Sequence, residues 1–260
     1  MFTPLMTHTW LAATLVAVLA GWAGFFTVMR GSSFAAHALP NGAFAGAAGA
    51  ALIGASTLLG LGVFSVAGAL LIAALGRRAR HDVATALTVV MMLGLGALFV
   101  SLRTTNAEQV YSLLFGQLFG VSSGQLSASY LIAAGCAAAL VVLHRPLLLS
   151  SVAPDVGAAR GLPPALVEAA FLVVIALVTT MAVPVVGALL VFTLLVSPAA
   201  AARRLTSHPV VALSIGIGLA LVEVWVAIAV SYRTSLPVGF LVGGTGAVLY
   251  AAVSTLARSN

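Results

Sequence analysis

The stretch HRPLLLSSVAPDVGAARGLPPALVE, from His144 to Glu168, decides how the chain is laid out, because it is too polar to cross a bilayer and too long for a tight turn. Within it, Asp155 follows a proline and is placed to cap a helix N-terminus, and Arg160 falls in the last turn of that helix. Gly161 can end the helix in a left-handed conformation, and Pro163-Pro164 prevents its continuation. We therefore predict a short polar helix between two membrane spans; the alternative is an ordinary connecting loop.

Composition assigns the chain to the class of membrane proteins with several spans. Of its 260 residues, 62% are hydrophobic and only 6% are charged, and the mean hydropathy is +1.20. Soluble domains carry roughly a quarter charged residues, so this sequence cannot build a water-exposed surface. Eleven arginines, five acidic residues and no lysine give a formal charge of +6, which the positive-inside rule explains without nucleic acid as a partner.

Apolar runs of about 18 to 22 residues mark the expected spans, because a hydrocarbon core about 30 Å thick needs about 20 helical residues. Nine such runs predict an all-α integral membrane protein, a polytopic bundle that forms a single domain over residues 1–260. Eight spans are possible, because no charge marks a loop near Ala55. The runs are approximately Trp10–Val28, Phe34–Gly54, Thr57–Leu75, Val83–Leu102, Leu126–Leu143, Ala165–Val183, Val185–Ala202, Val210–Val230 and Leu236–Leu256.

The arginines predict the orientation of these spans. When the first connection is placed inside, nine arginines are cytoplasmic and only Arg103 and Arg233 are outside. The cytoplasmic set is Arg30, Arg77, Arg78, Arg80, Arg145, Arg160, Arg203, Arg204 and Arg258. We expect the N-terminus outside, the C-terminus in the cytoplasm, and a first span that is retained, since it lacks a basic leader region and a small-residue cleavage site.

Two segments between spans carry specific expectations. The segment Thr104–Gln125 has polar ends and a short apolar middle, so we expect an outer-side loop or a re-entrant helix around Val110–Phe119. Pro184 is expected to break the chain between the sixth and seventh spans, because one helix over residues 165–202 would be about 57 Å long. Glycines at helix-contact spacing, such as those at 42 and 46, predict closely packed helices.

Several chemistries are excluded by the residues that the sequence lacks. A Walker A loop needs a lysine to reach the nucleotide phosphates, so ATP, if it drives this protein, is bound by another subunit. Cys136 is the single cysteine, which rules out an intrachain disulfide and a CxxC metal pair. No histidine faces an acid or another histidine at helical spacing on one span, and we expect neither an enzymatic nucleophile–base pair nor a cofactor bound by this chain.

Two ionisable residues are candidates for a polar pathway. Glu223 is well inside the eighth predicted span, where a carboxylate is expensive to bury and usually faces a cavity or a partner; the alternative is a structural hydrogen bond to a neighbouring helix. His37 is within two turns of the cytoplasmic end of the second span, where the alternative is an interfacial histidine with satisfied hydrogen bonds. Glu168, at the start of its span, is interpreted as a charge that complements the helix dipole.

The segment Pro184–Leu205, PVVGALLVFTLLVSPAAAARRL, carries a resemblance to a known family. Its VVGALL and PAAAARRL elements closely resemble the membrane subunits of metal-type ABC importers, the zinc and manganese permease family. Three further stretches agree with that family in order and spacing. They are Arg77–Ser101 (RRARHDVATALTVVMMLGLGALFVS), Leu113–Gly120 (LLFGQLFG) and Leu236–Gly239 (LPVG). The resemblance covers most of the chain from Arg30 onward.

The resemblance implies a homodimeric, non-enzymatic permease in a bacterial cytoplasmic membrane that imports Zn²⁺ or Mn²⁺. It implies as partners separate ATPase subunits that bind ATP, an extracytoplasmic lipoprotein that delivers the substrate, and a second copy of the chain. The loop at about residues 144–164 falls where the family has the cytoplasmic coupling helix that docks on the ATPase. The residues expected to make that contact are Asp155, Gly157, Ala158, Arg160 and Gly161.

The sequence departs from the family at the expected metal ligands. After its first span the family has an R-x-x-x-x-x-D-x-x-x-H-like arrangement whose Asp and His are linked to metal in the pathway. An ungapped alignment from Arg30 places Ala36 and Pro40 at those positions, with His37 one residue off. The metal ligands are therefore unassigned. Two alternatives stay open, namely import of a chelated metal or small organic cofactor by the same architecture, and a stand-alone secondary carrier that uses Glu223.

Overall fold

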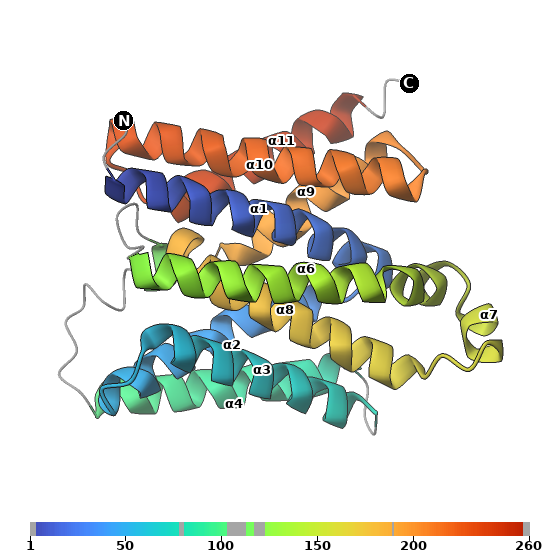
Figure 1. Ribbon diagram of the computed structural model, residues 1–260, viewed down its shortest axis with the longest axis horizontal. Helices are drawn as coiled ribbons and strands as arrows, with labels where there is room; N and C mark the ends of the chain where they lie inside the picture. The colour runs from blue at the N-terminus through green and yellow to red at the C-terminus, as the bar shows by residue number, and fades with distance from the viewer. Residues whose placement is uncertain (1–3, 78–80, 103–112, 117–122, 189, 257–260) are drawn as a thin grey trace.

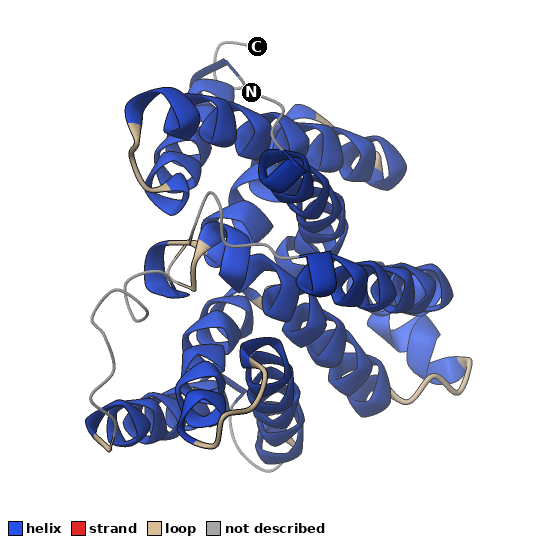
Figure 2. Cartoon of the chain, turned by 60° about the vertical axis from the view of Figure 1, so that its left-hand side comes forward, coloured by secondary structure: helices blue, strands red, loops and turns tan. Residues whose placement is uncertain are grey.

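The computed structural model describes residues 4–77, 81–102, 113–116, 123–188 and 190–256. Within these ranges all regular structure is helical (Figure 2). The helices are α1 (Pro4–Arg30), α2 (Ser33–Leu52), α3 (Thr57–Gly76), α4 (His81–Ser101), α6 (Ser123–Val152), α7 (Pro154–Ala159), α8 (Pro164–Val186), α9 (Val191–Leu205), α10 (Pro209–Thr234) and α11 (Val238–Leu256). The predicted all-α bundle is confirmed, and each of the predicted spans has a helix in its place.

The long helices lie side by side, and the short helix α7 marks one end of the bundle, at the right in Figure 1. We call this the α7 end. Contacts between α1 and α10 show that these two neighbouring helices run in opposite directions. The rings of Trp10 and Trp225 are 6.4 Å apart, and Gly21 lies against Ile217, so residue numbers rise along one helix as they fall along the other.

Helix α8 lies in the middle of the bundle. One group, α2, α3 and α4, packs against it on one side, and α1, α9, α10 and α11 form a second group, with α6 against α1 and α8. In α8, 72% of the most apolar window is buried inside the bundle, against 28% in α3, α4 and α6 and 22% in α11. The outer helices present apolar side chains such as Leu131 and Val248, as contact with lipid requires.

Seven of the described helices, α1, α3, α4, α6, α8, α10 and α11, are long and apolar enough to cross a membrane. The other two predicted spans, α2 and α9, are different in composition or length. α2 contains His37, Pro40 and Asn41, and α9 has 15 residues, which extend over about 22 Å. Both helices are largely buried among their neighbours, so their surroundings are mostly protein and they need less apolar surface.

Two helix ends differ from the prediction. Pro184 does not break the chain, because α8 continues to Val186 and ends at Gly187, whose φ is +91°. Proline is tolerated in a membrane helix where neighbouring helices surround it, whereas a positive φ cannot continue a right-handed helix. α6 continues to Val152, so the first part of the loop predicted at residues 144–164 is helical.

Helices α2 and α3 cross where two glycines meet. A methyl group added at Gly46 would overlap the Gly60 carbonyl and lie 2.7 Å from the Cβ of Phe64. A methyl group added at Gly60 would lie 2.6 Å from the Cβ of Ala50. The two backbones therefore touch directly, which confirms the close packing expected at Gly46. By contrast, Gly94 of α4 has no atom within 4 Å of such a methyl group.

Gly60→Ala is expected to lower the stability of the purified protein in detergent by about 1 to 3 kcal/mol, because the crossing helices must move apart to admit the methyl group. Thermal unfolding in micelles measures the change. Gly94→Ala is the matched control, and its stability should equal or exceed that of the wild type. An equal loss in both variants would contradict direct backbone contact at Gly60.

Candidate functional site

Helix α7 joins α6 to α8 and starts at a proline. Its N-cap residue is Ala153 and its first helical residue is Pro154, so the prediction that Asp155 caps the helix is wrong. Proline occupies the first helical position without loss, because the N–H that it lacks has no partner there. Asp155 lies inside the first turn, where its negative charge complements the helix dipole without a side-chain cap bond.

The C-terminal end of α7 closes with two backbone hydrogen bonds. The Leu162 N–H donates to the Gly157 carbonyl at 3.2 Å, and the Gly161 N–H donates to the Ala158 carbonyl at 3.0 Å. Gly161 has a φ of +75°, and Arg160 is the C-cap residue. This pair of bonds around a left-handed glycine is the Schellman motif, which confirms the ending predicted from Gly161.

The predicted contact residues of α7 do not all face outward. Gly157 is buried, and a methyl group there would lie 3.8 Å from Leu149 and 4.0 Å from Leu162. The outward-facing members of the set are Asp155, Ala158, Arg160 and Gly161, which are all exposed. Gly157 therefore seats α7 on the end of α6, and the other four form a surface open to a partner.

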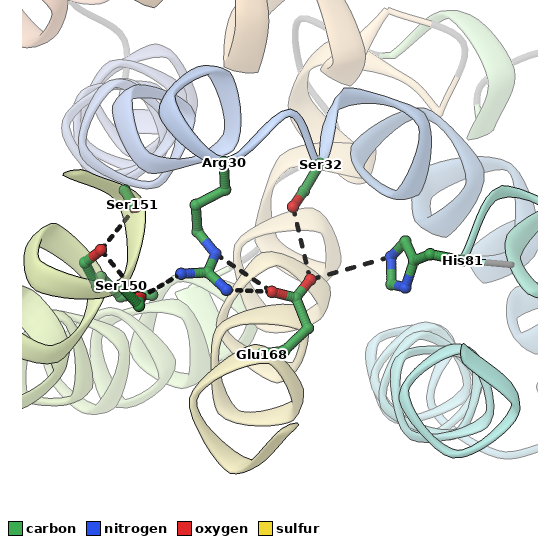
Figure 3. A network of polar contacts seen from close by, with 7 residues as sticks. Arg30, Ser32, His81, Ser150, Ser151 and Glu168 are labelled. Atoms are coloured by element: carbon green, nitrogen blue, oxygen red, sulfur yellow. Dashed lines mark hydrogen bonds and ion pairs between the residues drawn. The ribbon is translucent and has the colours of Figure 1, made fainter. Parts of the chain in front are cut away.

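At the α7 end, the carboxylate of Glu168 lies among polar side chains from several helix ends (Figure 3). Arg30 donates through Nε to Glu168 Oε2 at 3.2 Å, and its Nη2 forms an ion pair with the same oxygen. Its Nη1 donates to Ser150 Oγ at 2.6 Å. The second carboxylate oxygen, Oε1, lies 3.5 Å from Ser32 Oγ and 3.9 Å from His81 Nε2. We call these five residues the Glu168 network.

The dipole interpretation of Glu168 missed this network. The side chains of Arg30 and Glu168 are only 12% and 23% exposed, so solvent and salt screen their attraction less than that of a surface pair. One signal was available, because arginine counting placed Arg30 on the same side of the membrane as the start of the span that holds Glu168. Sequence alone does not say which of the cytoplasmic arginines reaches this carboxylate.

Glu223 is 1% exposed and lies deep inside α10. Neither of its carboxylate oxygens has a hydrogen-bond partner among the described residues. A methyl group added at Gly246 of α11 would lie 2.8 Å from Glu223 Oε1 and 2.7 Å from Thr193 Cγ2, so the carboxyl fits where glycine leaves room. The nearby Ser197 hydroxyl donates instead to the Gly246 carbonyl at 2.6 Å. Within the described chain Glu223 makes no hydrogen bond to a neighbouring helix, so the alternative of a structural hydrogen bond is not supported.

His37 lies on the exposed side of α2. Its ring packs edge-on against Phe192 of α9 with centroids 5.1 Å apart, and its Nε2 lies 3.4 Å from Asn41 Nδ2, one turn further along α2. The Asn41 amide also donates to the His37 carbonyl at 2.9 Å. Ala36 and Pro40, which occupy the positions of the expected metal ligands, are buried against neighbouring helices.

The two pathway candidates lie near different residues of α9. His37 contacts Phe192, whereas Glu223 lies beside the next residue, Thr193. Consecutive residues of an α-helix point about 100° apart, so the two side chains lie near different faces of α9. Within the described residues, no three His, Cys, Asp or Glu side chains come together as a metal site requires.

At the far end of α8 from α7, three segments meet through their backbones. They are residues 113–116, residues 185–187 and the start of α11 at Gly239. We call this contact the glycine junction, after Gly116, Gly187 and Gly239. Residues 113–115 form one helical turn, and the rest of the re-entrant helix expected at Val110–Phe119 lies outside the described residues.

Each glycine of the junction faces the backbone of another segment. A methyl group at Gly239 would lie 2.6 Å from the Phe115 carbonyl oxygen, and one at Gly187 would lie 2.5 Å from the carbonyl carbon of the same residue. The Ala188 N–H donates to the Leu113 carbonyl at 2.9 Å. Side chains larger than hydrogen cannot occupy these positions without separating the segments.

Comparison with known proteins assigns the chain to a family. A model described as the ABC 3 transport family matches residues 2–257. This chain belongs to the ABC 3 transport family. It is a metal-type ABC transporter permease, as the resemblance predicted, and a multi-pass membrane protein.

Two relatives and one solved structure illustrate the similarity. The manganese transport system membrane protein MntC of Halalkalibacterium halodurans is 28% identical over 214 residues, which cover 80% of this chain and 73% of that protein. The manganese import system permease protein ScaB of Streptococcus parasanguinis is 24% identical over 246 residues, or 92% and 86% of the two chains. PsaBC from Streptococcus pneumoniae, solved in complex with Fab, has the same fold, with a TM-score of 0.86, 20% identity, and coverage of 96% and 91%.

Three of the stretches that carried the resemblance to ABC permeases meet in space. LLFGQLFG contributes Gly116, VVGALL contributes Gly187 and LPVG contributes Gly239, and these are the three glycines of the junction. The sequence similarity at these separated places therefore corresponds to one contact of the ABC 3 family fold.

Gly187→Ala is expected to destabilise this ABC 3 permease far more than Gly54→Ala. Both glycines have a positive φ, which costs a non-glycine residue about 1 to 3 kcal/mol, but only Gly187 also faces the backbone of another segment. Gly54 has no atom within 4 Å of an added methyl group. The yield of monodisperse protein and its thermal unfolding in detergent measure both losses, and equal losses would argue against the junction.

Proposed function

We propose that this permease imports a divalent metal ion, with Mn²⁺ the first candidate, and that separate ATPase subunits supply the energy. The structural observation that carries the proposal is α7, a short helix seated on the end of α6 with an exposed outer surface. An ABC permease without lysine has no Walker A loop, so force must enter from another chain. The relatives MntC and ScaB are named as manganese transport proteins, which supports this metal over Zn²⁺.

In this proposal the α7 end faces the cytoplasm. The arginines at the helix ends near α7, including Arg30 and Arg77, support that orientation through the positive-inside rule. α7 then docks on an ATPase subunit, a second copy of the permease completes the pathway, and an extracytoplasmic binding lipoprotein delivers the metal from the other side. The chain acts as a transport subunit and not as an enzyme.

The proposed route for the metal runs beside α9. His37 and Asn41 form an exposed pair on α2, with nitrogen and oxygen atoms suited to a transition-metal ion such as Mn²⁺. Glu223, near Thr193 of α9, is a buried carboxyl without a described partner, which is typical of functional sites in membrane proteins. We propose that both residues contribute to passage of the ion.

Ala158→Trp is expected to reduce binding of the co-expressed ATPase subunit at least about tenfold, because a bulky side chain on the exposed surface of α7 separates the two proteins. Recovery of the ATPase on affinity-tagged permease measures the effect. Ala158 is a better position than the buried Gly157, where a large side chain would disturb α7 itself. The matched control is Ala74→Trp, an exposed alanine near the same end of α3; normal ATPase recovery with Ala158→Trp would contradict docking at α7.

A strain that lacks this permease is expected to regain growth in metal-limited medium when Mn²⁺ is added, and complementation by the wild-type chain should restore ⁵⁴Mn uptake. Glu223→Gln should lower that uptake about tenfold, because a neutral amide attracts a divalent cation less than a carboxylate does. The control on the same helix is Ser214→Ala, which removes an exposed hydroxyl.

Parallel cultures supplemented with zinc or iron identify the cargo. Rescue of growth by zinc alone would show that zinc, and not manganese, is the substrate. Rescue by none of the three metals would contradict metal import.

A further inference from the structure

The Glu168 network occupies a specific place between α7 and the rest of the bundle. Ser150 lies two residues before the end of α6, and Glu168 lies four residues after the start of α8. These two helix ends are the places where α7 is joined to the bundle, through residue 153 and residues 160–163. The Arg30 side chain bonds to both helices, to Ser150 near the end of α6 and to Glu168 near the start of α8 (Figure 3).

The network also reaches the helix that carries His37. Ser32 is the N-cap residue of α2, but its hydroxyl makes no cap bond to its own helix and lies instead 3.5 Å from Glu168 Oε1. Arg30 is the last residue of α1, and only Gly31 separates it from Ser32. The Glu168 carboxylate, which belongs to α8, therefore contacts both the end of α1 and the start of α2.

Local packing makes this connection stiff. The Arg30 guanidinium lies 5.9 Å from the centre of the Phe171 ring on α8, and three of its nitrogens are engaged with Glu168 or Ser150. A guanidinium held by several bonds in a partly buried place keeps one geometry, unlike the flexible ion pairs of a solvent-exposed surface. These contacts join the first turns of α8 to the end of α1 and the start of α2.

We infer that Glu168, held by Arg30, is a positioning residue that transmits movement of α7 to α2, and with it to the exposed pair His37 and Asn41. The inference rests on the proposed function, in which an ATPase moves α7. It adds a role for residues that touch neither the ATPase surface of α7 nor the proposed metal route. The network is the connection between the two.

A cysteine reporter on α2 tests the inference without any metal. The only native cysteine, Cys136, is fully buried, so His37→Cys places a single exposed thiol on α2. In the purified complex with its ATPase, the thiol-labelling rate at this position should change about five- to tenfold when a non-hydrolysable ATP analogue is added. In the Glu168→Gln background, which keeps the side-chain shape but removes the charge, that change should fall below about twofold.

The control background is Arg204→Gln. Arg204, on α9, stacks on Tyr250 of α11, with its guanidinium carbon 5.6 Å from the ring centre, and it is not a member of the Glu168 network. This variant should keep the full nucleotide response. Ser32→Ala, which leaves the Arg30–Glu168 ion pair intact, provides a second variant if Glu168→Gln fails to assemble, and it should also reduce the response.

The outcomes separate a transmitting role from a structural one. If the network only stabilises the fold, Glu168→Gln lowers the unfolding temperature while the nucleotide response of assembled complexes stays at the wild-type level, and the inference is wrong. An absent response in the wild-type background would also overturn it, because α7 would then not be connected to α2. Metal uptake is measured in a separate experiment. The labelling experiment uses no metal, so its result can be interpreted even if metal import fails.

Discussion

Hydrocarbon cannot hydrogen-bond a peptide group, and this constraint shapes every part of the bundle. Each span is a helix because only a helix satisfies its own backbone inside a bilayer. Helices whose outer surfaces are all apolar gain little by burying more apolar area, so they associate by close packing, which is where the glycines act. Gly46 and Gly60 let α2 and α3 touch through their backbones, and the glycine junction does the same for three separate segments.

The same constraint moves charge to the ends of the helices and makes the exceptions informative. Arg30 and Glu168 lie together at the α7 end beside His81, and the attraction of the Arg30–Glu168 pair is partly shielded from water. Glu223 is the exception, since it is buried in α10 without a described partner. A cost of that kind persists in a membrane protein where the carboxyl is used, which is the reason it enters the proposed metal route.

Helix α8 joins the two ends of the molecule. Its first turns carry Glu168 and are attached to α7, and its last residues enter the glycine junction with residues 113–116 and the start of α11. The helix is buried over most of its length and passes Pro184 without breaking. Helix α8 is therefore held at both ends by specific contacts, as the proposed coupling of the permease to an ATPase requires.

Hydropathy and arginine placement determined much of this protein from sequence, because both follow from the transfer of single side chains between water and lipid. They predicted the all-α bundle and a helix at the place of each expected span, seven of which are long and apolar enough to cross a membrane, and the turn chemistry of Gly161 predicted the end of α7. Tertiary structure alone decided which side chains meet. It paired Arg30 with Glu168, placed His37 against Phe192 of α9, and put the end of α8 at Gly187 instead of Pro184. These outcomes depend on the packing of helices far apart in the chain, and the residues of one helix do not encode what lies across from them.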